Sequence, residues 1–361
     1  MSTPAEARSA VVASVTPIEI DGSFGEGGGQ VLRTALSLAA ITNRAFRMTR
    51  IRARRGDAGL RAQHLRAVEA VAALCGARVE GATLGSQNLT FEPGRIVAGD
   101  FRFDVGTAGS TSLILQTLLP PLARAGAASR VEIRGGTHVR WSPCFDYLRL
   151  HWLPFGRKIG LDAEIEMERA GFYPAGGGIV RATIRPGGAF SPLRLSERGA
   201  LRRIRGVSAV ARLHVRIAAR QRDQAARRIA GRSHPFDCDL VLMPSGSPGT
   251  MLLLLAEFER SQACFFALGE RGKPAERVAD EAVDELFAFL DGDGAVDCHL
   301  ADQLVLLLAL APGTSELTTS RVTGHLVTNA EIVKRFLPVS IAVEGKPDGP
   351  GLVRVEGGWM P

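Results

Sequence analysis

The sequence from residue 25 to residue 33 reads Gly25-Glu26-Gly27-Gly28-Gly29-Gln30-Val31-Leu32-Arg33, and this stretch decides the fold. It follows a short strand-like run, Ile18 to Ile20, and leads into an apolar run that extends to Ile41. Glycines between a strand and a helix let backbone N–H groups approach an anion, and the helix N-terminus adds partial positive charge. We therefore expect a strand, a tight turn and a helix whose first residues face a ligand.

The turn differs from the common nucleotide-binding motifs. It lacks a Gly-Lys-Ser/Thr ending, which excludes a P-loop, and its glycines are adjacent rather than spaced as in a dinucleotide fingerprint. A carboxylate, Glu26, stands inside the turn, and an acid beside a phosphate-binding turn suggests a site that also holds a divalent cation. The alternative is a purely structural turn in which Glu26 interacts favourably with the helix dipole. The turn alone leaves both interpretations open.

Length and composition indicate a globular protein of two domains. The chain has 361 residues, 45% of them hydrophobic, and none of its apolar runs reaches the length of a membrane span. Residues 1–17 are small and polar without the pattern of a signal peptide, so we expect a disordered tail. The five cysteines are scattered and form no Cys-x-x-Cys pair, which argues against a disulfide framework or a zinc site and fits a reducing cytoplasm.

Positive charge is concentrated in one part of the sequence. The net charge is +7, and most of the cationic residues are arginines. A GC-rich genome would explain the overall excess of arginine but not its clustering. The clustered residues are Arg44, Arg47, Arg50, Arg52, Arg54, Arg55, Arg61 and Arg66. Arginine binds phosphate through paired N–H donors, so this density predicts a footprint for a phosphate backbone.

An internal repeat organises the chain. Three apolar helices are expected to carry a glutamine near the start, namely Gln30, Gln116 and Gln303, and each precedes a strand-like run and a second helix. Such units build sheets that are covered by helices on one face. We therefore predict an α/β (α+β) fold whose large domain contains three repeated βαβα-type units around a pseudo-threefold axis.

The third unit is interrupted by an insertion. The second and third glutamines lie much farther apart than the first and second, and residues 195–293 carry a pattern of their own. Helices are expected over 215–230 and 273–290, with strands over 201–213, 239–243 and 252–258. We read this as a smaller inserted α/β domain, so that the large catalytic domain comprises residues 18–194 and 294–361.

The strand-to-helix loops of equivalent units are expected on one side of the large domain, where sites of open α/β sheets gather. Among the histidines, His64, His138 and His325 fall in or beside such loops. His325 follows a glycine and precedes an expected helix for which Asn329 is the candidate N-cap. A nucleophile or general base is plausible at His325, although the spacing is also compatible with a structural histidine. Cys298 beside His299 is not enough for a catalytic dyad.

Five ordered motifs resemble one known family. They are Gly25-Glu26-Gly27-Gly28-Gly29-Gln30-x-Leu32-Arg33, Gly106-x-Ala108-Gly109-Ser110, Phe172-Tyr173-Pro174-Ala175-Gly176-Gly177-Gly178, Leu300-Ala301-Asp302-Gln303-Leu304 and His325-Leu326-x-Thr328-Asn329. Together they are similar to the RNA 3′-terminal phosphate cyclase family. The resemblance covers nearly the whole chain after the N-terminal tail, including the insertion.

The resemblance implies an ATP-dependent reaction that converts an RNA 3′-phosphate to a 2′,3′-cyclic phosphate. A histidine that matches His325 attacks the α-phosphorus of ATP and becomes histidyl-AMP. The AMP then moves to the RNA 3′-phosphate, giving an RNA-pp-A end, and the neighbouring 2′-hydroxyl expels AMP. Because ring closure is intramolecular, the enzyme mainly has to position groups and neutralise charge.

The resemblance also implies a role for each matching residue. Glu26 would bind Mg²⁺ or Mn²⁺. The phosphates of ATP or of the RNA end would be held or positioned by Arg33, Arg52, Arg55, Gln63 and His64. The adenylate pocket would contain Gln116, Pro143, His299, Leu300, Ala301, Asp302 and Gln303, with Phe265 of the insertion closing over the nucleotide. His299 stands where the family pattern has tyrosine, and an imidazole can also stack on adenine.

Three alternative functions compete with this interpretation. A non-catalytic relative that acts in ribosome assembly is expected to lack the nucleophile and the arginine cluster, which this chain has. An enolpyruvyl-transferase-like enzyme would leave His325 and the adenylate motif without a role. A simple RNA-binding module would be expected to expose more stacking aromatics, which make up only 6% of the residues. The expected partners are therefore ATP and RNA with a 3′-phosphate end, while the oligomeric state stays open.

Overall fold

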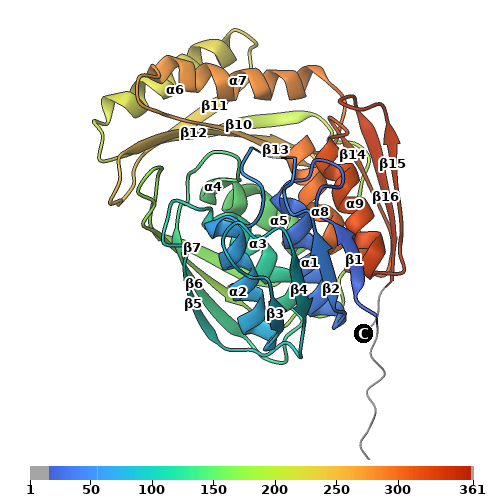
Figure 1. Cartoon of the computed structure of the whole chain (residues 1–361). Coiled ribbons are helices and arrows are strands. Elements are labelled where there is room, and N and C mark those ends of the chain that lie inside the picture. The colour runs from blue at the N-terminus through green and yellow to red at the C-terminus, as the bar shows by residue number, and fades with distance from the viewer. Residues whose placement is uncertain (1–15, 55, 359–361) are drawn as a thin grey trace, which may run out of the picture.

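The computed structural model describes residues 16–54 and 56–358. Most of the expected tail and Arg55, one of the expected phosphate-binding residues, lie outside the described residues. Within the described ranges, the helices are too short or too polar for any of them to cross a membrane. Figure 1 presents the chain with its elements labelled.

The first unit begins with the glycine-rich turn. Its elements are β1 (Ile18–Asp21), α1 (Gly29–Thr42), β2 (Phe46–Thr49), α2 (Ala62–Cys75), β3 (Arg78–Glu80) and β4 (Leu89–Glu92). Strands β1 and β2 are parallel, whereas β4 is antiparallel to both β2 and β3. The order in the sheet is therefore β1-β2-β4-β3.

The second and third units repeat this topology. The second contains β5 (Asp100–Asp104), α3 (Thr111–Leu122), β6 (Ser129–Gly135), α4 (Phe145–Tyr147), a π-helical turn over Leu148–Trp152, α5 (Leu153–Ile159), β7 (Ala163–Arg169) and β8 (Gly178–Ile184). The third contains β9 (Arg194–Leu195), α8 (Cys298–Leu310), β14 (Gly313–Thr319), α9 (Gly324–Phe336), β15 (Ser340–Gly345) and β16 (Gly351–Gly357). Their strand orders are β5-β6-β8-β7 and β9-β14-β16-β15.

The mixed α/β fold expected from the sequence is confirmed. In each of the three sheets the first two strands are parallel and the last two join antiparallel, so one supersecondary pattern occurs three times. The pseudo-threefold relation between the units stays a prediction.

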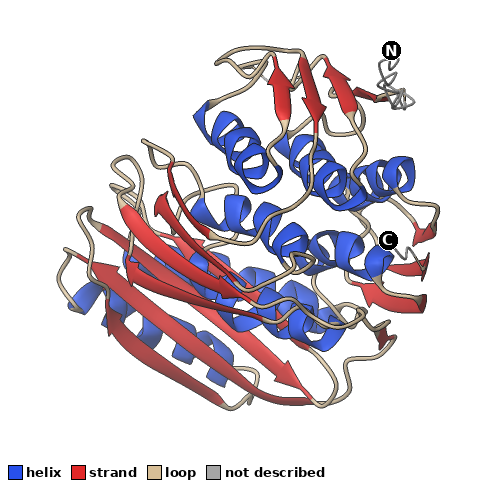
Figure 2. Cartoon of the chain, turned by 90° about the horizontal axis from the view of Figure 1, so that it is seen from below, coloured by secondary structure: helices blue, strands red, loops and turns tan. Residues whose placement is uncertain are grey.

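The helices of the three units pack together in the middle of the large domain, with the sheets around them (Figures 1 and 2). Helix α1 contacts α2, α3 and α9, and α9 also contacts α8. A helix that is surrounded in this way must be apolar on most of its circumference. Helix α8 meets this requirement, because eleven of its thirteen residues are buried. The dense helical core holds the helix starts, and therefore the side chains they carry, in fixed relative positions.

The insertion forms a sheet of its own between β9 and α8. Its elements are β10 (Leu201–Ala211), α6 (Arg216–Ala230), β11 (Phe236–Leu242), β12 (Gly249–Phe258), β13 (Gln262–Leu268) and α7 (Ala275–Asp291). The strand order is β11-β10-β12-β13, and α6 and α7 enclose a separate apolar cluster on one face of this sheet. Two details differ from expectation: β13 was not predicted, and Leu195 belongs to β9 of the large domain rather than to the insertion.

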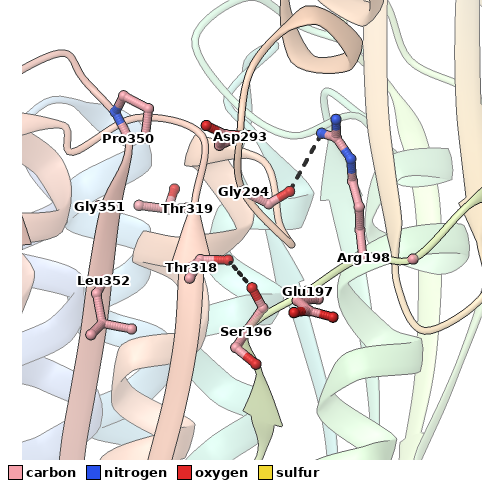
Figure 3. A pocket seen from close by; sticks show the side chains of 11 residues that line it. Ser196, Glu197, Arg198, Asp293, Gly294, Thr318, Thr319, Pro350, Gly351 and Leu352 are labelled. Carbon is pink, nitrogen blue, oxygen red and sulfur yellow. Dashed lines mark hydrogen bonds between the residues drawn. The ribbon is translucent and has the colours of Figure 1, made fainter.

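Arg198 ties the two connections of the insertion together. Its guanidinium donates hydrogen bonds to the carbonyls of Phe289 and Leu290 in the last turn of α7, at 2.8 and 3.1 Å, and to those of Gly292 and Gly294 beyond it, at 2.9 and 3.4 Å. The last carbonyls of a helix have no partner within the helix, so Arg198 supplies what α7 lacks. The bond to Gly294 is drawn in Figure 3.

We predict that Arg198→Ala lowers the free energy of unfolding by about 2 kcal/mol, because charge-assisted hydrogen bonds to half-buried carbonyls are lost. Chemical denaturation measures the change. Arg202→Ala, which removes an exposed arginine from β10, is the matched control and should have little effect. Equal stability of the Arg198 and Arg202 variants would contradict the role of Arg198.

Candidate active site

Four side chains from separate segments form a chain of polar contacts. His325, in the first turn of α9, places Nε2 2.9 Å from Oε2 of Glu26 and Nδ1 2.9 Å from Oε1 of Gln30. The Gln30 amide in turn donates to Oδ1 of Asp302 in α8 at 3.4 Å. The glycine turn, α1, α8 and α9 therefore meet at one place. Glu26 and His325 remain open to solvent, with side chains 36% and 43% exposed.

The glycine turn lies so close to α9 that side chains would not fit between them. A Cβ atom on Gly25 would lie 2.0 Å from Oγ1 of Thr328, and Gly25 also has a φ of +59°, which L-residues rarely adopt. A Cβ on Gly324 would lie 2.7 Å from Oε1 of Glu26. Both glycines are therefore needed for Glu26 to reach His325.

The start of α9 differs from the expectation. The helix begins at Gly324, and Thr323 is its N-cap, because the Thr323 hydroxyl accepts a hydrogen bond from the Leu326 N–H at 3.1 Å. His325 is therefore part of the first turn rather than of the preceding loop, and Asn329 lies inside the helix rather than at its cap. A Ser or Thr two residues before the histidine was the sequence signal for this cap.

Asn329 instead joins three helices. Its amide nitrogen donates to the carbonyl of Asp302 at 2.7 Å, and its oxygen accepts from the hydroxyl of Thr34 at 2.7 Å. Because Asn329 is 4% exposed, both bonds are shielded from water. The sequence did not indicate the hydrogen bonds by which Asn329 joins the helices or those by which Gln30 connects His325 to Asp302. Both Asn329 and Gln30 nevertheless lie within the motifs that carry the resemblance.

His64 is a buried, neutral hydrogen-bond donor. Its Nδ1 accepts the N–H of Arg61 at 3.2 Å, which leaves the proton on Nε2. Burial and, after it, the nearby charges of Arg33, Arg52 and Arg61 lower the pKa of His64 to about 3. The Nε2 atom faces the start of α1, because a Cβ on Gly29 would lie 2.3 Å from it and 3.0 Å from Nη1 of Arg33. A ring N–H and a guanidinium thus point at the same helix start.

Two of the three expected arginines surround this helix start. Arg33 is half-buried, and burial lowers its pKa to about 10 although the charge of Asp302 opposes the shift. Arg52 donates Nη1 to the carbonyls of Asp57 and Gly59 at 2.7 and 3.0 Å, so its guanidinium is anchored to the following loop. Helix α1 has no side-chain cap on its first N–H groups. Cations and N–H donors without a capping carboxylate suit an anionic ligand.

The second part of the expected site lies along α8. Asp302 is 7% exposed, and burial, together with the charges of Asp297 and Glu26, raises the pKa of its carboxyl group against the opposing effect of Arg33. The Gln303 side chain accepts a hydrogen bond from the Gln116 amide of α3 at 2.7 Å. The structure thus brings Asp302, Gln303 and Gln116 together, and Leu300 and Ala301 are fully buried in the same helix.

The beginning of α8 is held by a buried carboxylate. Asp297 accepts the N–H groups of His299 and Leu300 at 3.1 and 3.0 Å, and its second oxygen lies 2.6 Å from Nε2 of His151. His299 itself is exposed in the first turn. Burial raises the pKa of the neighbouring Cys298 thiol to about 11, so a Cys298–His299 dyad has no nucleophilic thiolate.

Of three further residues expected at the site, Gln63 and Pro143 lie near other expected site residues and Phe265 does not. The Gln63 side chain accepts the N–H of Ser110 at 2.8 Å and so lies next to His64, between the first and second units. Pro143 is half-buried in the loop before α4, and Tyr147 of α4 donates a hydrogen bond to Asp297 at 3.3 Å. Phe265 is not at this site, which corrects the expectation.

Phe265 lies away from the site because side chains of a strand alternate between the two faces of the sheet. Successive residues of β13 point to opposite faces of the sheet. Phe265 therefore packs in the core of the insertion, 5.6 Å between ring centroids from Phe289, and is 8% exposed. Its neighbour Phe266 faces the large domain and lies 6.0 Å from the ring of Tyr147.

The donors present define what kind of cation the site fits. Across residues 16–54 and 56–358, no group of three or more His, Cys, Asp or Glu side chains forms a metal cage. A single accessible carboxylate, Glu26, suits Mg²⁺ or Mn²⁺ only if most ligands come from water and a substrate phosphate. The arrangement is therefore compatible with a cation that arrives with its phosphate ligand.

A groove lies elsewhere, where the insertion meets the large domain. It has a volume of about 500 Å³ and runs between Arg198, Asp293 and the ends of β14 and β16, where the insertion joins the third sheet (Figure 3). None of the expected catalytic or nucleotide-binding residues lines it. The polar cluster around His325, rather than this groove, is the candidate active site.

Comparison with known proteins agrees with the motifs. The family model described as RNA 3′-terminal phosphate cyclase matches residues 24–343. Proteins named RNA 3′-terminal phosphate cyclase from Methylococcus capsulatus and Ralstonia nicotianae are each 46% identical, over 95% and 94% of this chain and 97% and 96% of their own. One from Methanopyrus kandleri is 42% identical over 94% of this chain and 98% of its own.

Among solved structures, the enolpyruvyl transferase NikO from Streptomyces tendae matches 47% of this chain and 33% of its own with a TM-score of 0.27 and 13% identity, a likeness too weak to support a conclusion.

The fold and site define an α/β protein with a polar, arginine-lined site at converging helix starts. The chain belongs to the RNA 3′-terminal phosphate cyclase family, because both the family model and full-length relatives cover almost all of it.

The buried neutral His64 predicts a specific pH dependence of stability. Its pKa is about 3 in the folded chain and 6.5 in the reference state, so below pH 6.5 the unfolded chain takes up a proton that the folded chain does not. We expect this residue to cost the wild type about 2 kcal/mol of stability between pH 7 and pH 5. In denaturation experiments, His64→Gln should not show this loss of stability between pH 7 and pH 5. The control variant His214→Gln, which changes an exposed histidine, should show the same loss as the wild type. Identical losses in wild type and His64→Gln would contradict the assignment.

Proposed function

We propose that this protein converts the 3′-terminal phosphate of RNA to a 2′,3′-cyclic phosphate at the expense of ATP, through histidyl-AMP and RNA-pp-A intermediates. The observation that carries the proposal is the contact of His325 with Glu26 and Gln30 at the meeting point of α1, α8 and α9. The names of the full-length relatives support the reaction class.

In the first step, Nε2 of His325 attacks the α-phosphorus of ATP. The N–P bond forms while the bond from the α-phosphorus to the bridging oxygen breaks, and pyrophosphate leaves. We assign the attack to Nε2 because the Gln30 oxygen accepts a proton from Nδ1, which leaves Nε2, beside Glu26, as the nitrogen with a lone pair for the attack. A nucleophile oriented by a hydrogen bond at its second nitrogen is a recurring arrangement.

Charge has to be neutralised around this step. A divalent cation, Mg²⁺ or Mn²⁺, when bound with ATP, would offset the negative charge of the triphosphate. Glu26 is the carboxylate that would hold it, and its Oε2 lies 2.9 Å from Nε2 of His325. Arg33, Arg52 and the Nε2–H of His64 provide further positive or donor groups at the start of α1.

The nucleotide would lie along α8. Asp302, Gln303 and Gln116 supply polar groups in hydrogen-bonded contact, and His299 stands exposed where it can stack on the adenine. Pro143 and the main chain at Leu300 and Ala301 would complete this pocket, whereas Phe265 lies in the core of the insertion. Because Asp297 fixes the first turn of α8, it positions the pocket without touching the ligand.

In the second step, an oxygen of the RNA 3′-phosphate attacks the same phosphorus from the other side and the N–P bond breaks, which frees His325. In the third step, the neighbouring 2′-oxygen loses its proton, attacks the 3′-phosphorus and expels AMP. AMP is a far better leaving group than a phosphomonoester oxygen, so activation makes ring closure possible. The arginines, Gln63 and His64 would hold the terminal phosphate in line.

We propose a cytoplasmic location, because the five cysteines are free and the reaction draws on ATP.

Labelling of the protein with α-labelled ATP tests the mechanism. We expect wild type to acquire an acid-labile, alkali-stable AMP, as befits a phosphoramidate, and to make 3′-phosphorylated RNA resistant to phosphatase. His325→Ala should lose both activities, whereas the matched control His299→Ala, an exposed histidine in α8, should retain the adduct at a reduced rate. Circular dichroism of each variant verifies folding.

Two outcomes would overturn the proposal. An adduct of undiminished yield on His325→Ala would place the nucleophile elsewhere. No adduct and no cyclised RNA with the wild type, in either Mg²⁺ or Mn²⁺, would favour a non-catalytic member of the family.

A further inference from the structure

Two large aromatic side chains stand in solvent on neighbouring loops. Trp141 is 95% exposed and Tyr173 is 78% exposed, and among the described residues no other phenylalanine, tyrosine or tryptophan side chain is exposed. Trp141 lies between β6 and α4, and Tyr173 lies between β7 and β8. Exposure of such large apolar surface is unfavourable in water and calls for an explanation.

The first residues of these two loops are joined by hydrogen bonds and by ring stacking. The N–H groups of Thr137 and His138 both donate to the carbonyl of Gly171, at 2.9 and 3.2 Å. The rings of His138 and Phe172 are stacked, with centroids 5.0 Å apart and an interplanar angle of 22°. His138 is 1% exposed and its Nε2 lies 3.1 Å from Oδ2 of Asp146. These buried contacts hold the loops that carry the exposed rings of Trp141 and Tyr173 in a fixed relative position.

The backbone at Trp141 is also unusual. Its φ is +63°, a left-handed conformation that is unfavourable for a bulky residue. The turn is closed by the Ser142 hydroxyl, which donates to the carbonyl of Val139 at 3.1 Å. Strain of this kind is retained where the surroundings impose it, and it is concentrated at binding sites.

The aromatic loops are continuous with the phosphate end of the candidate active site. Gly176 follows Tyr173 in the same loop and packs against the loop of residues 106–110, since a Cβ on it would lie 2.8 Å from the Thr107 carbonyl. At the end of that loop, the Ser110 N–H donates to Gln63 at 2.8 Å. Gln63 is adjacent to His64, so a strand whose end lies at His64 is directed toward Tyr173 and Trp141.

Two arginine side chains flank the exposed rings. Arg140 precedes Trp141 and is paired with Glu270 of the insertion, while the exposed Arg169 donates to the carbonyl of Gly177 at 2.8 Å. Exposed aromatic rings beside arginines are how proteins bind single-stranded nucleic acid without reading its sequence.

From this arrangement we infer that Trp141 and Tyr173 form a stacking surface for the unpaired bases that precede the 3′-terminal nucleotide of an RNA substrate. The inference rests on the proposed function for the identity of the bound strand. It assigns the two aromatic rings to RNA, because the loop of Tyr173 leads through Gly176 and Ser110 to Gln63 and His64, whereas Pro143 of the Trp141 loop belongs to the proposed adenylate pocket. Bases are held here by their faces, so the surface accepts any sequence but requires a single-stranded end.

Tryptophan fluorescence reports on this surface directly. The sequence contains three tryptophans, and Trp152 is 2% exposed. A 3′-phosphorylated single-stranded RNA of about ten nucleotides, added without ATP, should quench the emission of the wild type. Trp141→Phe should bind the RNA with little loss of affinity but with much less quenching, because phenylalanine can still stack. ATP with Mg²⁺ and no RNA should leave the Trp141 contribution unchanged.

Affinity and activity variants complete the test. Trp141→Ala and Tyr173→Ala should each weaken binding of this RNA by roughly tenfold, the loss expected for one stacked base. Both should still form the AMP adduct from ATP alone at the wild-type rate. Leu84→Ala is the matched control, because Leu84 is also apolar and 66% exposed but lies in the loop between β3 and β4.

The outcomes separate this inference from the proposed function. If both alanine variants bind RNA like the wild type, or if Trp141→Ala loses adduct formation from ATP alone, the inference is wrong while the proposed reaction stands. If the wild type forms no adduct but both variants bind RNA weakly, the reaction is wrong while the stacking surface stands.

Discussion

The close approach of two helix starts is the constraint on which the site depends. The turn before α1 and the first turn of α9 lie so close that Gly25 and Gly324 have no room for a Cβ atom. This proximity lets Glu26 reach one nitrogen of His325 while Gln30 holds the other. Asn329 secures the arrangement by joining α9 to α1 and α8. The acid and the imidazole therefore meet because of packing among helices rather than because of a loop conformation.

Electrostatics at the site follows from the same packing. Burial near three arginines keeps His64 neutral, so it offers an N–H group without adding charge, and burial raises the pKa of Asp302. The result is a surface rich in donors at the start of α1 and a solvent-accessible carboxylate at Glu26. Anionic phosphate groups would bind the donors at the start of α1, and an accompanying cation would bind the carboxylate of Glu26. We regard this complementarity as the physical basis of the proposed reaction.

The fold class could be predicted from the sequence, whereas the local geometry of the site could not. Glycines, apolar runs and the glutamine repeat are local signals, and the strand–turn–helix at Glu26 follows from them. The N-cap of α9 was placed at Asn329 instead of Thr323, because both residue types cap helices and only the fold shows which one starts the helix. Phe265 was misplaced because the face on which a strand residue lies depends on register, which the unpredicted β13 sets.

A crystal structure with a non-hydrolysable ATP analogue and Mn²⁺ would test the central claim most directly. The account predicts that the α-phosphorus lies about 3.5 Å from Nε2 of His325, in line for attack, with the metal ion on Glu26 and the adenine along α8 beside His299. A nucleotide bound instead in the groove between Arg198 and Asp293, or with its phosphates turned away from His325, would contradict it.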